Sequence, residues 1–454
     1  MNKKTEEKLS LIRGLGFFGA IGLVSGTMIG TGVFLKSAIM AHDLKSIFYV
    51  ISAWVVAGLL SLAGALSYAE LGARYPRAGG EFAYLKEIYG DLSGFFYGWM
   101  RFWIGSPASI AAYAIGAATF FASGLGVTES GTFIKTWAII SIIVFSGINC
   151  LTVIVSGRLQ VVLTALKILM VLGLALAMFL VGGSSVDLSA TFARGEFTGL
   201  SAFAAAMMAA LWAYDGWNNM PMVSSEIKDP QKNVPRALIW GTLIVMAVYV
   251  LINIGYFMVL PLEEVINSSS KYNPEALPVA AKAAASFFGE NSGKIFSFLF
   301  VVSALGAMNG SILTSARVPY AMSEAKVFPN IFEKLSHTTR VPVMSVIIQA
   351  LISIAFAFTN SFDQLTDYVV FSAWIFYTMC TFGVIVERRK KKPIANLYQV
   401  PFYPWTPVLF ILTSVWLLVS SVISLPRESV IGVLIIGSGY PFYMYFKKAR
   451  TINQ

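Results

Sequence analysis

Residues 25–34 read SGTMIGTGVF and place three glycines, two threonines and one serine inside the first long apolar segment of the chain. A backbone group without a hydrogen-bond partner costs several kcal/mol in hydrocarbon, so a break in a membrane helix survives only where it lines a protected cavity. Close packing of two helices is the alternative interpretation, because Gly26 and Gly30 lie four residues apart and form a small-residue contact face. On its own, the stretch fits both interpretations equally well.

Composition supports a membrane setting for this stretch. The 454 residues are 57% hydrophobic and only 12% charged, whereas soluble domains are about 25% charged. Apolar runs long enough to cross a hydrocarbon layer of roughly 30 Å recur along the whole chain. We identify twelve, at residues 14–37, 46–72, 92–123, 134–155, 159–182, 199–223, 236–261, 292–323, 342–359, 361–386, 404–425 and 429–446. The sequence therefore predicts an all-α polytopic membrane protein, with residues 1–454 forming a single domain.

The distribution of Lys and Arg predicts the orientation, since basic residues accumulate in cytoplasmic loops. With the N-terminus inside, the inner segments carry 22 basic residues and the outer segments, Lys36 included, carry 8. The remaining three of the 33, Arg101, Lys167 and Arg317, are embedded in the membrane. We expect both termini in the cytoplasm. The net charge of +10 is then a topology signal, and no nucleic-acid partner is expected.

Other functional classes find little support. Cys150 and Cys380 lie in apolar segments and indicate packing residues, and the two histidines, His42 and His337, lie in loops. No metal or cofactor is therefore expected. An enzyme would need clustered catalytic side chains and a channel a polar file or rings of like charge. A receptor would need an output domain larger than connectors of about 18 residues allow.

A second interruption resembles the first. Residues 207–225 read MMAALWAYDGWNNMPMVSS and place polar residues, one glycine and one proline in the middle of the sixth segment. Segments one and six begin equivalent halves if residues 14–182 and 199–386 are two sets of five, with two extra helices in 404–446. The third segment of each set, 92–123 and 292–323, is unusually long. Interrupted helices at matching places in two halves indicate the binding site of a secondary transporter.

The chemistry of the two breaks suggests the ligand. Free N–H groups and the positive dipole end favour an anion where a helix restarts, and free carbonyls favour an ammonium group where a helix stops. Two broken helices together form a receptor for a zwitterion, and an amino acid has this pattern of charge.

Several ordered motifs carry a family resemblance. GTMIGTGVF, AELGARYPRAGGEFAYLKEIYG, AYDGWNNM followed by EIKDPQKNVPRAL, and NGSILTSARVPYAMSEAKVFP span most of the chain. It resembles the amino acid/polyamine/organocation (APC) transporter superfamily, and within it the L-type amino acid transporter-like branch with its bacterial serine/threonine and alanine/serine/cysteine exchangers. The resemblance implies twelve transmembrane helices in a leucine-transporter-like 5+5 inverted repeat plus two, and transport by alternating access.

The resemblance also implies roles for particular residues. The substrate carboxylate would meet the backbone and hydroxyl around Thr31 and Gly32, and the amino group would meet carbonyls at the first helix end and in the second break. Trp212 would be the aromatic lid on the outer side, although an interfacial aromatic is the alternative. The four carbonyls belong to Met28, Trp212, Ala213 and Asp215.

Three polar residues leave alternatives open. Lys167 would occupy the place where sodium-coupled relatives bind an ion, near Ser303; it could be a fixed ammonium, a group that releases its proton during the cycle, or a snorkelling lysine. Asp215 could attract a cationic side chain or stabilise the break, and we favour the structural role. Arg317 would serve gating or loop anchoring, and Arg101 departs from the family without an assignable role.

The implied function is sodium-independent exchange of small or medium neutral L-amino acids, with a proton-coupled amino acid symporter as the alternative. Animal light subunits of the branch bind a heavy chain through a cysteine after the third segment, where this chain reads GLGVTESGT. No disulfide-linked heavy-chain partner is therefore expected. We expect a single chain in a bacterial plasma membrane.

Overall fold

The computed structural model describes residues 10–127, 131–182, 195–273, 276–391 and 394–452. Helices dominate these ranges, and β structure in them is confined to two isolated bridges, Leu15 with Ile227 and Ala78 with Val223. The predicted all-α class is confirmed. Some of the basic residues used for the orientation, and part of the GLGVTESGT loop, lie outside the described ranges: Lys3, Lys4, Lys8, Arg194, Lys392 and residues 128–130.

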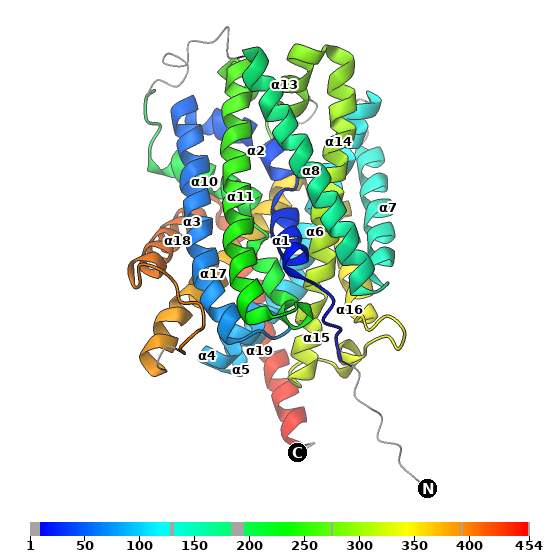
Figure 1. The fold of residues 1–454 in the computed structure, drawn as a ribbon, viewed down its shortest axis with the longest axis vertical. Coiled ribbons are helices and arrows are strands. Elements are labelled where there is room, and N and C mark those ends of the chain that lie inside the picture. Colours follow the sequence, from blue (N-terminus) through cyan, green and yellow to red (C-terminus); the bar gives the residue numbers. More distant parts are fainter. Residues whose placement is uncertain (1–9, 128–130, 183–194, 274–275, 392–393, 453–454) are drawn as a thin grey trace.

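The helices form an elongated bundle with most axes along its length (Figure 1). They are α1 (Phe17–Met28), α2 (Gly32–Leu44), α3 (Ile47–Arg74), α4 (Glu81–Tyr89), α5 (Asp91–Met100), η1 (Arg101–Gly105), α6 (Ser106–Leu125), α7 (Gly131–Asn149), α8 (Val153–Gly182), α10 (Leu200–Tyr214), η2 (Trp217–Met222), η3 (Ser224–Glu226), α11 (Pro230–Val259), α12 (Leu262–Ile266), α13 (Val279–Phe288), α14 (Glu290–Ser315), α15 (Arg317–Glu324), η4 (Asn330–Glu333), α16 (Val343–Thr359), α17 (Phe362–Lys390), α18 (Trp405–Ser424) and α19 (Pro426–Ile452).

Each of the twelve predicted segments overlaps a helix. Within the described residues, ten helical spans are long and apolar enough to cross a membrane, while α10 and α16, in the sixth and ninth segments, are shorter. Large apolar side chains point outward from α8, α18 and α19, including Leu169 (68% exposed), Leu412 (65%) and Leu434 (64%). Such a belt is stable only against lipid, so the chain is a multi-pass membrane protein.

The first interruption lies where the sequence predicted it. α1 ends at Met28, and α2 begins at Gly32 after three non-helical residues. The two helices form one broken segment from Phe17 to Leu44. Carbonyls at the end of α1 and N–H groups at the start of α2, which have no hydrogen-bond partner within their own helix, therefore meet in the interior of the bundle.

The second interruption follows α10. Asp215 is extended, with ψ 146°, and Gly216 has φ +121°, a conformation that L side chains rarely adopt. The chain continues as the 3₁₀ helix η2, which contains Pro221. Glycine at position 216 thus ends the helix and redirects the backbone in the membrane interior.

The long third segment is continuous from Asp91 to Leu125, but it is not uniform. Its five residues Arg101–Gly105 form a π-helix between α5 and α6. α6 packs along α14, and α1 contacts α8, α11 and α14. The segment that precedes α1 runs toward the end of the molecule at which α19 ends, at the bottom of Figure 1.

Candidate functional site

The two interruptions touch each other directly. The Thr27 hydroxyl donates to the Gly216 carbonyl at 2.9 Å, and a methyl group on Gly216 would lie 2.9 Å from the Thr27 carbonyl carbon. Carbon atoms in non-bonded contact stay about 3.5 Å apart or more, so residue 216 can carry no side chain. Thr27 and Gly216 are 189 residues apart in the sequence, yet the two breaks form one site.

Thr31 and Gly32 lie at the start of α2, where Gly32 faces Ala213 of the second break and the Thr31 side chain packs against Gly116 of α6. The Thr31 hydroxyl is buried, and in the described part of the chain it has no hydrogen-bond partner. A methyl group on Gly32 would lie 2.6 Å from both Cα and Cβ of Ala213. Glycine at position 32 therefore allows α2 to pack on α10.

The candidate carbonyls are partly occupied by the protein. The hydroxyl of Tyr249 of α11 lies 2.6 Å from the Met28 carbonyl and 2.9 Å from the Ala213 carbonyl, and its single proton can be donated to either oxygen. The Trp212 carbonyl accepts the Asp215 N–H at 3.1 Å. Since a carbonyl oxygen has two lone pairs, each can accept one more bond. The sequence reasoning missed Tyr249, because α11 is an unbroken apolar helix with nothing to distinguish this tyrosine.

Aromatic rings pack beside the two breaks. The ring of Trp212 lies 5.4 Å from that of Tyr113 of α6 and makes an edge contact at 6.3 Å with Phe362 of α17. Tyr113 in turn donates to the Thr27 carbonyl at 3.3 Å. Trp212 is 2% exposed, so these rings close the space above the breaks.

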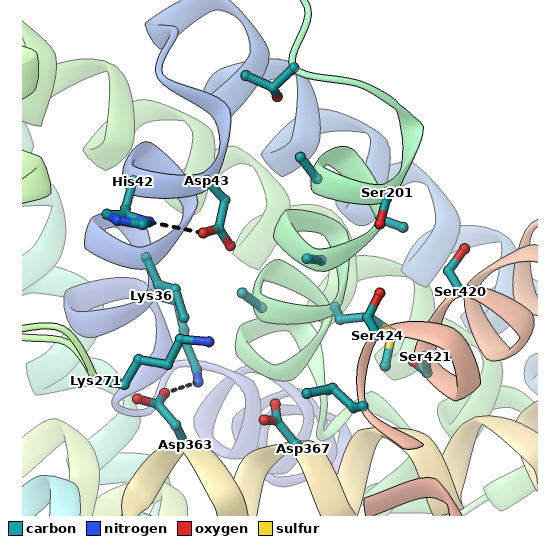
Figure 2. A pocket seen from close by; sticks show the side chains of 18 of the residues that line it. Lys36, His42, Asp43, Ser201, Lys271, Asp363, Asp367, Ser420, Ser421 and Ser424 are labelled. Atoms are coloured by element: carbon teal, nitrogen blue, oxygen red, sulfur yellow. Dashed lines mark hydrogen bonds and ion pairs between the residues drawn. The ribbon is translucent and has the colours of Figure 1, made fainter. Parts of the chain in front are cut away.

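A buried ion pair lies beyond the aromatic rings (Figure 2). The Lys36 ammonium lies 2.6 Å from Asp363, donates to the Thr366 hydroxyl at 2.9 Å and lies 4.8 Å from the centre of the Phe362 ring. Placing Lys36 among the outer-loop cations was wrong: α2 continues to Leu44, and Lys36 is 3% exposed. An apolar run in the sequence ends at a lysine. The helix continues through Lys36 because its charge is paired with Asp363 of α17.

Figure 2 shows the cavity on the far side of this ion pair. It has a volume of about 590 Å³ and is lined by α2, α10, α17 and α18, with Asp43, Lys271 and Asp367 among its charged side chains. We call this cavity the vestibule; Lys36, which also lines it, contacts Phe362 of the ring cluster around Trp212.

Lys167 of α8 lies beside the first break and is fully buried. Its ammonium donates to the carbonyls of Gly26 at 2.7 Å, Ile29 at 2.6 Å and Ser303 at 3.1 Å. The Ser303 hydroxyl, from α14, donates to the Ile29 carbonyl at 3.2 Å. An ammonium has three N–H groups, and each has an acceptor here. The geometry excludes snorkelling, and it joins α8, α14 and the end of α1.

The end of the second interrupted segment, at η3, is held by a second ion pair. Arg317 forms a two-pronged pair with Glu226, at 2.8 and 3.1 Å, and also donates to the Leu313 carbonyl at 2.7 Å. Both charged side chains are 0–1% exposed. The Leu15 N–H donates to the Glu226 carbonyl at 3.0 Å, so the segment before α1 is anchored at the same point.

A second polar cluster lies between the site and the inner end. The Glu81 carboxylate, at the start of α4, accepts from Tyr97 at 2.9 Å and from Asn218 at 3.0 Å. Burial raises the pKa of Glu81 to about 7, although Arg101 opposes the shift. Arg101 donates to Asn219 at 3.0 Å, so both residues contact η2, the helix after the second break.

Asp215 faces protein rather than solvent. Its carboxylate accepts a hydrogen bond from the Tyr377 hydroxyl of α17 at 2.8 Å and interacts electrostatically with Arg101. The six residues proposed for substrate contact are brought together at the two breaks, and all are buried. They are Met28, Thr31, Gly32, Trp212, Ala213 and Asp215.

A bundle of apolar helices, in which two membrane segments are broken at one buried polar site, is typical of a membrane transporter. The chain belongs to the amino acid permease family, whose profile matches residues 15–444. It is similar to the serine/threonine exchanger SteT of Bacillus subtilis (strain 168), with 32% identity over 98% of this chain and 99% of the relative.

Animal relatives align over almost the same length. The b(0,+)-type amino acid transporter 1 of Mus musculus is 28% identical over 96% of this chain and 88% of its own. The cystine/glutamate transporter of Homo sapiens is 28% identical over 97% and 86%. Family and relatives alike are amino acid transporters, not enzymes.

Proposed function

We propose that the chain is a sodium-independent exchanger of small or medium neutral L-amino acids. The observation that carries the proposal is the Lys167 ammonium, which satisfies three carbonyls where a bound metal cation would otherwise be needed to join α1 and α14. A neutral amine would have only two N–H groups and would direct its lone pair at a carbonyl oxygen. The arrangement therefore favours a permanently charged lysine, and a site that needs no sodium.

The substrate contacts follow from the two breaks. The carboxylate binds at the start of α2, where the first N–H groups have no helical acceptor and the Thr31 hydroxyl is free to donate. The ammonium binds the remaining lone pairs of the carbonyls of Met28, Trp212, Ala213 and Asp215. The rings of Trp212 and Tyr113 cover the site, which favours small or medium side chains.

The same proposal includes the topology. Twelve transmembrane helices are arranged as a 5+5 inverted repeat, residues 14–182 and 199–386, with two further helices in 404–446. The break in the first helix of each set supports this topology. The packing of the two long third members, α6 and α14, on each other supports it too. The chain works alone in a bacterial plasma membrane, with both termini in the cytoplasm and the vestibule of Figure 2 outside.

The test is uptake of radiolabelled serine by purified protein in liposomes, at fixed pH and without sodium. We expect uptake to be slow into empty liposomes and strongly stimulated by unlabelled serine inside. An imposed inward proton gradient should leave the rate unchanged. Uptake into empty liposomes that rises with the proton gradient would contradict exchange and identify a proton-coupled symporter in which Lys167 releases its proton.

A further inference from the structure

The segment of residues 400–405, between α17 and α18, presents two large aromatic side chains outward. Phe402 is 83% exposed, and Trp405, the first residue of α18, is 74% exposed. Neither belongs to the proposed substrate site. Exposed apolar surface next to polar side chains marks a contact surface, so the surroundings of the 400–405 segment indicate what covers these rings.

The ring of Trp405 continues the lipid-facing side of α18. Trp405, Leu409 and Leu412 follow one another at spacings of four and three residues, which places them on one face of the helix. Leu409 is 62% and Leu412 65% exposed, and α18 lies at the edge of the bundle in Figure 1. Since lipid covers this face, Trp405 lies where the face meets the headgroup layer, the depth at which tryptophan is enriched.

The backbone of the 400–405 segment holds Phe402 close to Trp405. The Trp405 N–H donates to the Phe402 carbonyl at 2.8 Å, and the Thr406 hydroxyl donates to the Pro401 carbonyl at 2.7 Å. Phe402 has φ +52°, a left-handed conformation that is unfavourable for a residue with a bulky side chain. A strained residue with an exposed ring indicates contact with a partner, because its packing in the bundle does not account for the strain.

The opposite face of the 400–405 segment is fixed to the bundle. The Val400 N–H donates to the Glu70 carboxylate of α3 at 2.7 Å, and Arg388 of α17 donates to the same carboxylate at 2.6 and 2.9 Å. The Arg388 guanidinium also lies 4.1 Å from the centre of the Tyr403 ring. A partner that binds the exposed rings is therefore held against α3 and α17 and stabilises their contact.

Cations lie beside the same segment. Arg389 and Lys390 directly follow Arg388 at the end of α17, and both are exposed. Basic residues at the edge of a membrane helix attract anionic lipid headgroups. We propose that the 400–405 segment, together with Arg389 and Lys390, is a docking surface for the headgroup layer of an anionic phospholipid membrane. The surface does not depend on the proposed exchange activity.

The first test measures the depth of residue 402. An environment-sensitive fluorophore is attached to F402C in a C150S background, in which Cys380 is fully buried. The protein is reconstituted in vesicles of equal parts phosphatidylcholine and phosphatidylglycerol. We expect strong quenching by lipids that carry bromine close to the headgroup, and weak quenching by iodide in the water. T338C, in the exposed loop between η4 and α16, is the control, and iodide should quench its label. Equal iodide quenching at both positions would overturn the proposal.

The second test measures lipid selectivity through the melting temperature of the protein in detergent, during titration with phosphatidylglycerol or phosphatidylcholine. Wild type should be stabilised by less phosphatidylglycerol than phosphatidylcholine. R389Q should weaken the apparent affinity for phosphatidylglycerol by about fivefold, the loss expected for one cation near the surface. W405S should weaken stabilisation by both lipids, because it removes apolar contact rather than charge.

K135Q is the control for net charge in the second test. Lys135 is exposed and lines a cavity with Asp363, near the start of α17 and so at the opposite end of that helix from Arg389. This variant should bind both lipids as wild type does. Identical phosphatidylglycerol titrations for R389Q and wild type, or a wild type that does not distinguish the two lipids, would contradict an anionic docking surface.

Discussion

Thr27 and Gly216 connect the two interrupted helices by a hydrogen bond of 2.9 Å from hydroxyl to carbonyl. The bond joins the end of α1 to the turn that follows α10, although the Leu23 carbonyl, at 2.6 Å from the same hydroxyl, competes for its proton. Both breaks also present backbone groups that a helix would otherwise satisfy. The described contacts around this bond lead to four expected outcomes.

Thr31→Val should weaken substrate binding while leaving the protein folded. The Thr31 hydroxyl is buried without a partner in the described part of the chain, so its removal relieves a cost in the absence of substrate. With substrate bound, the loss of one hydrogen bond to a carboxylate, about 1.5–3 kcal/mol, should raise the KM for serine by at least about tenfold. Thr31→Ser keeps the hydroxyl and should behave like wild type. Equal KM values for the two variants would exclude a role for this hydroxyl.

Lys167→Met should abolish most transport. The substitution roughly keeps the length of the side chain but removes the ammonium donor from the Gly26 and Ile29 carbonyls, of which Ile29 keeps the Ser303 hydroxyl, and an unsatisfied buried group costs about 1–3 kcal/mol. We expect uptake in liposomes to fall by about tenfold or more, together with a lower melting temperature. Lys167→Arg is the matched control for charge, since it keeps a cation of different shape. Normal uptake by the Met variant would show that the lysine only fills space.

Asp363→Asn should loosen the contact between α2 and α17. Lys36 is 3% exposed and would lose the carboxylate that its ammonium contacts directly, and an uncompensated buried cation is strongly destabilising. Hydrogen–deuterium exchange of residues 33–40 and 362–367 should become faster. Glu333→Gln breaks the more exposed pair with Lys326 and serves as control. No difference between the variants would mean that Lys36 and Asp363 do not hold α2 against α17.

Glu81→Gln should remove part of the pH dependence of stability. The pKa of Glu81 rises from 4.5 to about 7 on folding, so between these values the folded state binds more protons, and stability falls as pH rises. The shift from 4.5 to about 7 corresponds to roughly 3 kcal/mol. Wild type should therefore melt at a lower temperature at pH 8 than at pH 5, and Glu81→Gln should reduce this difference.

Several groups could contribute to the same pH dependence, so the comparison must be between variant and wild type. A difference between pH 5 and pH 8 that is identical in both proteins would show that Glu81 is ionised throughout. The titratable and charged groups that interact with Glu81 are Arg101, Tyr68, Tyr84, Tyr97, Tyr377 and Cys380.

The helices and both breaks could be predicted because they depend on local composition. Glycine, asparagine and proline rarely gather in the middle of a long apolar run unless the membrane helix is interrupted there. Within SGTMIGTGVF, residues 29–31 indeed separate α1 from α2. The ends of the helices were predicted less well. The first segment continues to Leu44, beyond the predicted end at residue 37, because a partner distant in the sequence neutralises Lys36.

The residues that surround the breaks could not be predicted from the sequence. Tyr249, Tyr377 and Tyr113 each lie in a regular helix, and only the packing of α11, α17 and α6 aims their hydroxyls at the broken backbone. A single tyrosine in an apolar helix commonly serves packing alone, so its sequence context does not distinguish it. Lys167 was identifiable because a cation inside a membrane segment is rare and usually functional.

The attachment of the Lys167 ammonium to α8 also limits what the proposed cycle can achieve energetically. A sodium ion enters from one compartment and leaves in the other, so its gradient can drive accumulation. A cation fixed by a covalent bond returns with the protein on every turn and performs no net work. A transporter built in this way cannot concentrate amino acids by itself: it brings the internal-to-external ratio of each substrate to a common value, and the cell must supply the gradient through another amino acid.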